Sequence, residues 1–404
     1  MRKKINLVAG LILGLYLSIL SAESTYISKI DNHAIVNSVL VNNRELIEPV
    51  LPENTNNFGF SVIECGKNHC YALKDNQLYS VGQNNYGQLG RSGGANQSTW
   101  GIVSGMSGVT QVVAGLDHGY AIKDNQLYSV GYNYYGQLGR SGKNNQNTWG
   151  VVNWMDNITK IVAGSNYGYA IKDNQLYSVG WNANGQLGRG NVINQSTWGI
   201  VSGMSGVTQV VAGEIHGYAI KDNQLYSVGY NYHGQLGIEG ATYRSTWSLV
   251  AGMNGVTQIV AGSNHGYAIK DNELYSVGLN TYGQLSKAGT SNQYIWSLVS
   301  GMNGVVQIFA GGNYGYAIKD NQLYSVGQNN FGQLGRAGMT NQSAWGIVEG
   351  MSNVTAIITG QNHSYAIKGN QLYSVGSNGN GQLGLGDTTD RNTFTPLDPA
   401  TLTE

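Results

Sequence analysis

The chain alternates short apolar runs with polar turns in a unit of 49 residues that recurs seven times. Residues 109–157 make up one copy. Residues 109–114 form an apolar run rich in β-branched side chains, and residues 120–122 and 127–130 follow after turns that contain Gly or Asp-Asn. Residues 149–152 form a fourth run after a longer polar loop. Runs of this length between turn residues predict four short β-strands per unit.

The period of the unit is constant, and no copy carries an insertion or a deletion. Its closing Gly-Gln-Leu motif begins at Gly87, Gly136, Gly185, Gly234, Gly283, Gly332 and Gly381. A fixed period of this size is typical of solenoids and propellers. A linear stack needs polar capping repeats, which this sequence lacks. We therefore predict an all-β fold, a seven-bladed β-propeller of four-stranded antiparallel blades.

The composition suits such a fold and narrows the choice of partners. Glycine accounts for 59 of the 404 residues, about twice the usual share of roughly 7%, as tight turns require. Only 11% of the residues are charged and the formal net charge is zero. A neutral chain has no global attraction to nucleic acid or to an anionic membrane surface, so we expect neither as a partner.

The N-terminal residues 1–22 have the three parts of a secretory signal peptide. A basic start at residues 1–4 precedes an uncharged apolar run at residues 5–20 and a small-residue cleavage site after Ala22. This pattern predicts an exported protein, either secreted, periplasmic or on the cell surface, whose mature chain begins near Glu23. An uncleaved membrane anchor is the alternative, but the run is shorter than the ~20 residues that a membrane span needs.

The remaining sequence divides into two parts. Residues 23–57 are irregular, although residues 46–51 could add a strand that closes the ring and protects an edge. Residues 58–400 contain the seven repeats and form the predicted propeller. Once the signal peptide is removed, no segment is expected to insert stably into a membrane.

Cys65 and Cys70 are the two cysteines of the chain and flank the first turn of the first copy. Export would permit a disulfide between them. Alternatively, they are two small buried residues, because the other copies place Ala, Thr, Gly or Ser at these positions. The sequence places only His69 beside them, which is too few ligands for a zinc site, and we expect no bound metal.

The polar columns of the repeat favour structural roles. Five histidines occupy one column, at His69, His118, His216, His265 and His363. Tyr167 and Tyr314 take their place in the other two copies, and tyrosine is a poor substitute for a catalytic base. Residues 379–384 fit the dinucleotide pattern Gly-x-Gly-x-x-Gly, but that motif must open a helix, and no helix is predicted there. We predict no catalytic residues and no cofactor, and an enzyme is disfavoured.

The repeat resembles that of a known family. Its string Val-Ala-Gly-x-x-His-x-Tyr-Ala-Ile, followed by Leu-Tyr-Ser-Val-Gly-x-Asn-x-x-Gly-Gln-Leu-Gly, is similar to the regulator of chromosome condensation repeat over residues 58–398. The resemblance implies a seven-bladed propeller that serves as a protein-binding platform. In some members it implies guanine nucleotide exchange on a small GTPase such as Ran, and secreted bacterial members act on host GTPases.

The sequence departs from the exchange factors of that family in two respects. Valine, as at Val81 and Val130, replaces the family's aromatic residue before the glycine of the third strand. The uninterrupted copies also leave no room for the protruding β-wedge of the nuclear exchange factor. No catalytic residue can therefore be carried over to this chain.

The differences between copies indicate which face of the propeller binds a partner. The hairpins after the second strand are nearly identical, whereas the turns and loops on the opposite face vary. Binding is therefore predicted at a cluster of aromatic residues on three consecutive blades and at two acidic turn residues, namely Tyr132, Tyr134, Tyr135, Trp181, Tyr230, Tyr232, Asp117 and Glu214. Drift at exposed loops is the alternative explanation.

The sequence therefore predicts a secreted, non-enzymatic protein-interaction module. The first alternative is an exchange-factor-like regulator of a Ran-type GTPase, including one in a host cell. The second is a lectin that binds glycans at several weak sites, although the aromatic residues are not repeated in every copy.

Overall fold

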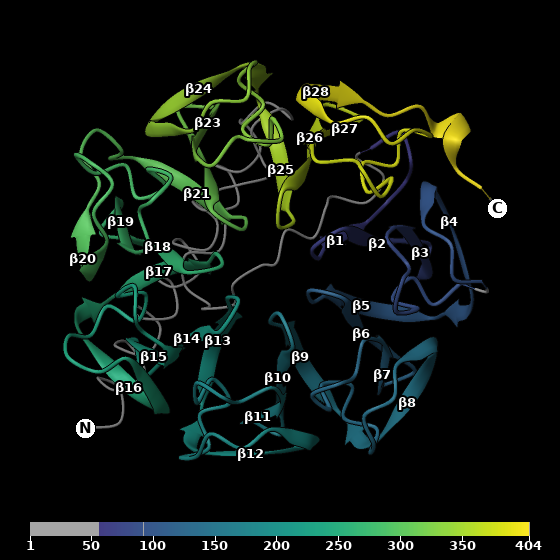
Figure 1. Ribbon diagram of the computed structural model, residues 1–404, viewed down its shortest axis with the longest axis horizontal. Helices are drawn as coiled ribbons and strands as arrows, with labels where there is room; N and C mark the ends of the chain where they lie inside the picture. Colours follow the sequence, from purple (N-terminus) through teal and green to yellow (C-terminus); the bar gives the residue numbers. More distant parts are fainter. Residues whose placement is uncertain (1–55, 92, 404) are drawn as a thin grey trace, which may run out of the picture. The chain divides into compact units, whose positions relative to one another are not determined.

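The structure is a computed structural model that describes residues 56–91 and 93–403. These residues form seven antiparallel sheets of four strands each, and every sheet runs in chain order. Figure 1 shows the seven blades following one another around a central axis. The first strands of successive blades contact one another around that axis. The seven-bladed propeller predicted from the repeat is confirmed.

The blades have closely matching boundaries. The first consists of β1 (Val62–Cys65), β2 (His69–Lys74), β3 (Gln77–Gly82) and β4 (Gln97–Ser107). The second consists of β5 (Val109–Ala114), β6 (His118–Lys123), β7 (Gln126–Gly131) and β8 (Gln146–Asp156). The third consists of β9 (Ile158–Ala163), β10 (Tyr167–Lys172), β11 (Gln175–Gly180) and β12 (Gln195–Ser205). The fourth consists of β13 (Val207–Ala212), β14 (His216–Lys221), β15 (Gln224–Tyr230) and β16 (Tyr243–Asn254).

The last three blades repeat the same plan. The fifth consists of β17 (Val256–Ala261), β18 (His265–Lys270), β19 (Glu273–Gly278) and β20 (Gln293–Leu298). The sixth consists of β21 (Val305–Ala310), β22 (Tyr314–Lys319), β23 (Gln322–Gly327) and β24 (Gln342–Ser352). The seventh consists of β25 (Val354–Thr359), β26 (His363–Lys368), β27 (Gln371–Gly376) and β28 (Arg391–Pro396), and the 3₁₀ helix η2 (Pro399–Thr401) follows it.

The turn chemistry of the repeat explains the inner hairpins. Asp124 and Asn125 have φ angles of 50° and 62°, which a two-residue hairpin of type I′ requires and which Asp and Asn tolerate. The fourth strand β8 is longer than the predicted residues 149–152. It contains a bulge, which the register change between Gln126 and Tyr128 marks.

The bulge shapes the core between blades. In the second blade it allows both Val152 and Met155 to face the interior, where each is 1% exposed. Both side chains pack in one cluster with Tyr120, Ile161 and other residues of the second and third blades. Equivalent valine and methionine pairs recur in five other blades and give each of those junctions its own apolar core.

One tryptophan replaces a glycine of this bulge. Five other blades place glycine there with φ between 75° and 79°, at Gly105, Gly203, Gly252, Gly301 and Gly350. Trp154 has a φ of 57° at the same position, and 54% of its surface is exposed. A left-handed backbone costs a non-glycine residue roughly 1–2 kcal/mol. The strain at Trp154 is therefore not required by the fold.

We expect Trp154→Gly to raise the free energy of unfolding by about 0.5–1 kcal/mol. Relief of the strain outweighs the greater flexibility of glycine in the unfolded chain, which costs roughly 0.5–1 kcal/mol. Urea denaturation of the purified protein measures the change. Gly203→Ala is the matched control, because a Cβ there would meet nothing within 4 Å, so only the backbone penalty should appear. A loss of stability in Trp154→Gly would contradict this account.

The first residues described help to join the first blade to the seventh. Phe58 and Phe60 are 2% and 0% exposed and share an apolar core with residues of both blades. The Asn57 side chain donates a hydrogen bond to the carbonyl oxygen of Leu397 at 3.2 Å and accepts one from the amide of Leu372 at 3.1 Å. These contacts replace the covalent connection that joins the blades at every other junction.

The C-terminal residues also connect the seventh blade to the first, by contacts with the outer strand β4. The amide of Thr403 donates to the carbonyl oxygen of Trp100 at 2.8 Å, beside an isolated parallel bridge between Thr403 and Gly101. The ring-closing strand predicted at residues 46–51 lies outside the described residues, as does the predicted signal peptide at residues 1–22.

A central cavity of about 120 Å³ lies on the propeller axis. Three consecutive residues from each blade line it, at the end of the first strand and the start of the following turn; they are residues 65–67, 114–116, 163–165, 212–214, 261–263, 310–312 and 359–361. Backbone hydrogen bonds connect these turns, as from Ser263 to Gly312 at 2.8 Å and from Gln361 to Gly66 at 3.1 Å. The second of these bonds joins the seventh blade to the first.

Two expectations drawn from sequence patterns are settled by the fold. Residues 379–384 lead through a loop into β28 and do not open a helix, which confirms that they are not a dinucleotide-binding motif. Cys65 and Cys70 form a disulfide between paired positions of β1 and β2, with their Cα atoms 4.2 Å apart. In the part of the chain that the structure describes, no helix is long and apolar enough to cross a membrane.

Candidate protein-binding face

The loops that differ between blades lie on one face of the propeller. The amide of Tyr132, at the start of the loop after the third strand, donates to the carbonyl oxygen of Asp117 in the turn after the first strand, at 2.9 Å. The hairpins after the second strand lie at the opposite ends of the strands, next to the connections between blades, where Val109 donates to Asn76 at 3.0 Å. We call the side with the variable turns and loops the loop face.

Amide side chains hold these loops in a fixed shape. In the second blade, Asn133 Oδ1 accepts a hydrogen bond from the backbone amide of Leu138 at 2.9 Å. The backbone amide of Asn133 donates to Asn145 Oδ1 at 2.9 Å. Gln137 Oε1 accepts from the amide of Tyr135 at 3.1 Å. The same bonds recur in other blades. Asparagine recurs at this position in every copy and caps each loop, and these bonds position the aromatic residues of the loops.

The first aromatic cluster spans three blades and consists of Tyr86, Tyr132, Tyr134, Tyr135 and Trp181. The rings of Tyr86 and Tyr132 lie 4.8 Å apart, and those of Tyr135 and Trp181 lie 5.5 Å apart. Tyr134 and Tyr135 meet edge to face at 5.1 Å. Tyr134 exposes 63% of its surface, so the cluster presents an aromatic ring to solvent.

The second aromatic cluster lies on the fourth and fifth blades and consists of Tyr230, Tyr232, His233, Tyr243 and Tyr294. The rings of Tyr230 and Tyr232 are stacked at 6.2 Å, and Tyr232 meets His233 at 5.2 Å. The hydroxyl of Tyr294 donates to the carbonyl oxygen of Tyr232 at 3.4 Å. Tyr232 is 61% exposed and Tyr294 is 48% exposed.

A single position of the loop explains why there are two clusters rather than the one predicted. Tyr86 and Tyr135 occupy the fourth position of their loops, and each reaches the first loop residue of the next blade. The third blade places Asn184 there, so its loop has no ring that could reach Tyr230. Across residues 56–91 and 93–403, no aromatic contact joins Trp181 to Tyr230.

The two acidic residues predicted at this face lie nearer the axis. Asp117 is 8% exposed, and its Oδ1 accepts a hydrogen bond from Gln88 of the first blade at 3.3 Å. Burial raises the pKa of Asp117, and nearby Lys67 opposes the shift. Glu214 lines the central cavity; burial raises its pKa, whereas Ser263 and Lys67 lower it. The part that these residues play in binding stays a prediction.

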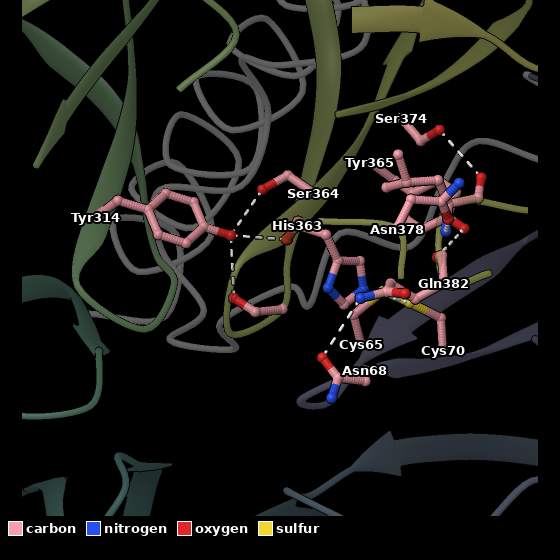
Figure 2. Close-up of a disulfide and its surroundings, with 12 residues drawn as sticks. Cys65, Asn68, Cys70, Tyr314, His363, Ser364, Tyr365, Ser374, Asn378 and Gln382 are labelled. Carbon is pink, nitrogen blue, oxygen red and sulfur yellow. Dashed lines mark hydrogen bonds between the residues drawn. A yellow bond between two sulfur atoms is a disulfide. The ribbon is translucent and has the colours of Figure 1, made fainter. Parts of the chain in front are cut away.

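The histidine column lies between blades, as its structural interpretation requires. His118 and its four counterparts are completely buried, and burial lowers the pKa of His118 to about 3, so its ring is neutral. In the sixth blade, the Tyr314 hydroxyl donates to the carbonyl oxygen of His363 in the next blade at 2.7 Å (Figure 2). Tyr167 makes the same contact with His216. The column therefore packs each blade against its neighbour.

Sequence comparison identifies the repeat. The family described as "Regulator of chromosome condensation (RCC1) repeat" matches residues 75–122, 173–220, 222–269 and 320–367, and a second form of the same repeat matches residues 256–284. The chain belongs to the family of β-propellers built from RCC1 repeats. No curated protein sequence matches the chain.

Solved structures share the fold at low sequence identity. Human WBSCR16 is 20% identical with a TM-score of 0.71, over 80% of this chain and 94% of that one. Prp20p from Saccharomyces cerevisiae is 18% identical with a TM-score of 0.70, over 83% and 86% of the two chains. Yeast RCC1 (Prp20) bound to Kap60 is 18% identical with a TM-score of 0.71, over 90% and 91%. At these identities the likeness shows the fold alone.

Several residues of the two aromatic clusters escaped the sequence analysis. Tyr86 and His233 share the fourth loop position with Tyr135, so reading that column across the blades would have found them. Tyr243 and Tyr294 come from the region where the loop enters the fourth strand, a region that differs between copies. Tyr243 pairs directly with Tyr230, a contact that required the register of β15 and β16.

Proposed function

We propose that this propeller is a non-enzymatic protein-interaction module that binds its partner through the two aromatic clusters of the loop face. The observation that carries the proposal is that these rings, of which Tyr134 and Tyr232 are the most exposed, lie on hydrogen-bonded loops and adjacent strand ends and are not repeated in every blade. The fold therefore does not require them. Tyrosine and tryptophan are enriched among the residues that dominate binding energy at protein interfaces, and clustered exposed apolar groups mark interaction sites.

The structural neighbours support a protein partner. The structure of Prp20p was reported together with its binding properties to Gsp1p and histones, and yeast RCC1 was crystallised bound to Kap60. These are properties of those proteins. They support the proposal that this propeller binds another protein, and we propose that the choice of partner depends on the loops.

Site-specific photo-cross-linking tests the proposed face. A photoreactive phenylalanine analogue at Tyr134 or at Tyr232 should capture the same partner, which mass spectrometry then identifies. The analogue at Asp222, an exposed hairpin residue on the opposite face, is the control and should capture no such partner. Equal capture from Asp222, or capture from Asp222 alone, would exclude the loop face as the binding surface.

A second candidate function is regulation of a small GTPase, which the fold shared with Prp20p favours. We nevertheless expect the protein to increase the rate of GDP release from a Ran-type GTPase less than about twofold. The repeats carry no insertion that could form a wedge beside the bound nucleotide. Release of a fluorescent GDP analogue at micromolar protein measures the effect, with a known exchange factor as positive control. A large acceleration would favour this second function.

A glycan partner is less compatible with the loops. A multivalent lectin gains avidity from several similar sites, whereas the two aromatic clusters differ in both residues and arrangement. The first contains a tryptophan and four tyrosines, and the second contains a histidine and four tyrosines. Glycan binding that is lost when Tyr134 or Tyr232 is replaced would support the lectin instead.

We also propose that the protein is exported, on the basis of the signal-like residues 1–22. The Cys65–Cys70 disulfide is compatible with an oxidising compartment. Deletion of residues 2–20 is expected to leave the protein inside the cell. N-terminal sequencing of the exported wild type should begin at or near Glu23, and an exported chain that still begins at Met1 would contradict cleavage.

A further inference from the structure

The junction of the seventh and first blades contains two sulfur atoms where the other blades have small side chains. Cys65 replaces the alanine or threonine found at Ala114, Ala163, Ala212, Ala261, Ala310 and Thr359. Cys70 replaces the glycine or serine found at Gly119, Gly168, Gly217, Gly266, Gly315 and Ser364. Both substitutions occur in the same blade, and the fold of the other blades does without them.

The two sulfur atoms lie beside a histidine of the neighbouring blade. His363, the first residue of β26, directs its imidazole ring toward the first blade (Figure 2). Its Nε2 atom lies 3.0 Å from Sγ of Cys70. The ligand atoms of Cys65, Cys70 and His363 all lie within 4.8 Å of one another. His69, the histidine that follows Cys65 in the sequence, is not part of this group.

The position of the group gives a small ion a route to it. Cys70 and His363 are completely buried, whereas Cys65 is 9% exposed and lines the central cavity. A reductant or an ion that enters the cavity therefore reaches Cys65 first. Lys67 stands at the same wall of the cavity.

The donor set has the chemistry of a zinc site. Thiolate sulfur and imidazole nitrogen are the ligands that Zn²⁺ prefers, and a Cys₂His set leaves one of the four positions open to water. Two thiolates, one neutral imidazole and one Zn²⁺ have no net charge, so such a complex avoids the large cost of burying an unpaired charge. Within the described residues, no other His, Cys, Asp or Glu joins the three.

We propose that reduction of the Cys65–Cys70 disulfide creates a Zn²⁺ site whose ligands are Cys65 Sγ, Cys70 Sγ and His363 Nε2. A dithiol reductant supplies two electrons and two protons to the disulfide and becomes a disulfide itself. Binding of Zn²⁺ then releases the two thiol protons to solvent. The disulfide and the zinc complex exclude each other, because both use the same two sulfur atoms.

The two states connect different parts of the propeller. The disulfide joins β1 to β2 within the first blade. The zinc complex would also bond to His363 in β26 and would therefore link the first blade to the seventh. Reduction with zinc thus keeps a link between β1 and β2 through the metal and adds one across the junction where the chain does not continue.

Titration of the full-length protein with Co²⁺ and Zn²⁺ tests the proposal. The protein is reduced with a phosphine and freed of it under nitrogen. One equivalent of Co²⁺ should then produce a thiolate-to-cobalt charge-transfer absorption, which one equivalent of Zn²⁺ should abolish. The melting temperature of the reduced protein should rise with Zn²⁺. The oxidised protein should show neither effect.

The chain itself supplies matched control variants. His363→Tyr introduces the residue that Tyr167 and Tyr314 provide at the same position in two other blades. Those tyrosines face Gly217 and Ser364 rather than a cysteine, so circular dichroism and a thiol assay first establish that the variant folds and keeps its disulfide. Its affinity for Zn²⁺ after reduction should fall by at least about a hundredfold, because loss of a direct ligand exceeds the roughly 10–100-fold effect of outer partners. Cys65→Ala with Cys70→Gly restores the residues of the other blades and should bind no zinc.

Three outcomes would overturn the proposal. The first is a reduced wild type without the charge-transfer absorption. The second is zinc affinity that does not change in His363→Tyr. The third concerns a reduced protein that unfolds without zinc. In that case, reduction in the presence of Zn²⁺ should preserve the circular dichroism spectrum of the folded protein. Unfolding to the same extent with and without Zn²⁺ would show that the cysteines serve only as a structural disulfide.

Discussion

Acidification from pH 7 to about pH 5 is expected to destabilise the propeller by several kcal/mol. His69, His118, His216, His265 and His363 are completely buried, and burial lowers the pKa of each to about 3. In the unfolded chain these histidines have a pKa of about 6.5. Below that pH the unfolded state binds more protons than the folded state, so its free energy falls relative to that of the folded state.

The size and the pH window follow from the same linkage. The histidines contribute no destabilisation above about pH 6.5, and their effect grows as the pH falls toward 3. One pH unit corresponds to about 1.4 kcal/mol per histidine, so each can cost up to about 2 kcal/mol at pH 5. The raised pKa values of the Asp117 and Glu214 carboxyl groups stabilise the folded state as the pH falls. These two carboxyl groups offset only part of the loss from the five histidines.

Urea denaturation at pH 7.5 and pH 5 measures this loss of stability. The variant His118→Tyr with His265→Tyr is the control, because tyrosine already occupies the column in the third and sixth blades. Two fewer histidines should reduce the difference between the two pH values by roughly two fifths. If the variant lost as much stability as the wild type, the histidine column would not be responsible for the loss.

Replacement of Trp181 by alanine is expected to weaken binding of the partner about thirtyfold. Trp181 packs against Tyr135 in the first aromatic cluster and does not recur in the other blades. Truncation of an interface residue of this kind costs about 2 kcal/mol, and each factor of ten corresponds to about 1.4 kcal/mol. Calorimetric titration with the partner identified by cross-linking measures the affinity. The melting temperature should barely change.

Trp198→Ala is the control for Trp181→Ala and should have the opposite profile. Trp198 is 2% exposed, lies 5.5 Å from Tyr120 and belongs to the core between the second and third blades. Its removal should lower the free energy of unfolding by about 3–5 kcal/mol. If Trp181→Ala unfolded the protein as readily, or left binding unchanged, the first aromatic cluster would be structural.

The repeat made the fold predictable because its turn chemistry is local. The Asp124–Asn125 hairpin follows from two adjacent residues that tolerate positive φ, and the same two residues recur in most copies. The bulge of β8 was missed because it depends on pairing with β7. It brings both Val152 and Met155 into the core. An alternating pattern of apolar residues does not predict that two residues at this spacing are both buried.

The sequence predicted the candidate binding face only by comparing residues at one position of the repeat at a time. Comparison of copies found Tyr132, Trp181 and Tyr230 without any structure. The separation into two clusters depends on Asn184, whose effect is seen only when loops of adjacent blades are placed side by side. The proximity of His363 to Cys70 was beyond the sequence altogether, because ring closure brings together residues that are 293 positions apart.

The contacts of Asn57 and Thr403 with neighbouring blades show that two blades of this ring stay joined without a peptide bond between them. The other junctions have equivalent apolar cores, so their peptide connections should be dispensable in the same way. A circularly permuted chain, opened between β12 and β13 and with the seventh blade linked to the first, should therefore form the same ring. The order of the blades along the gene is then one of several orders that the fold would accept.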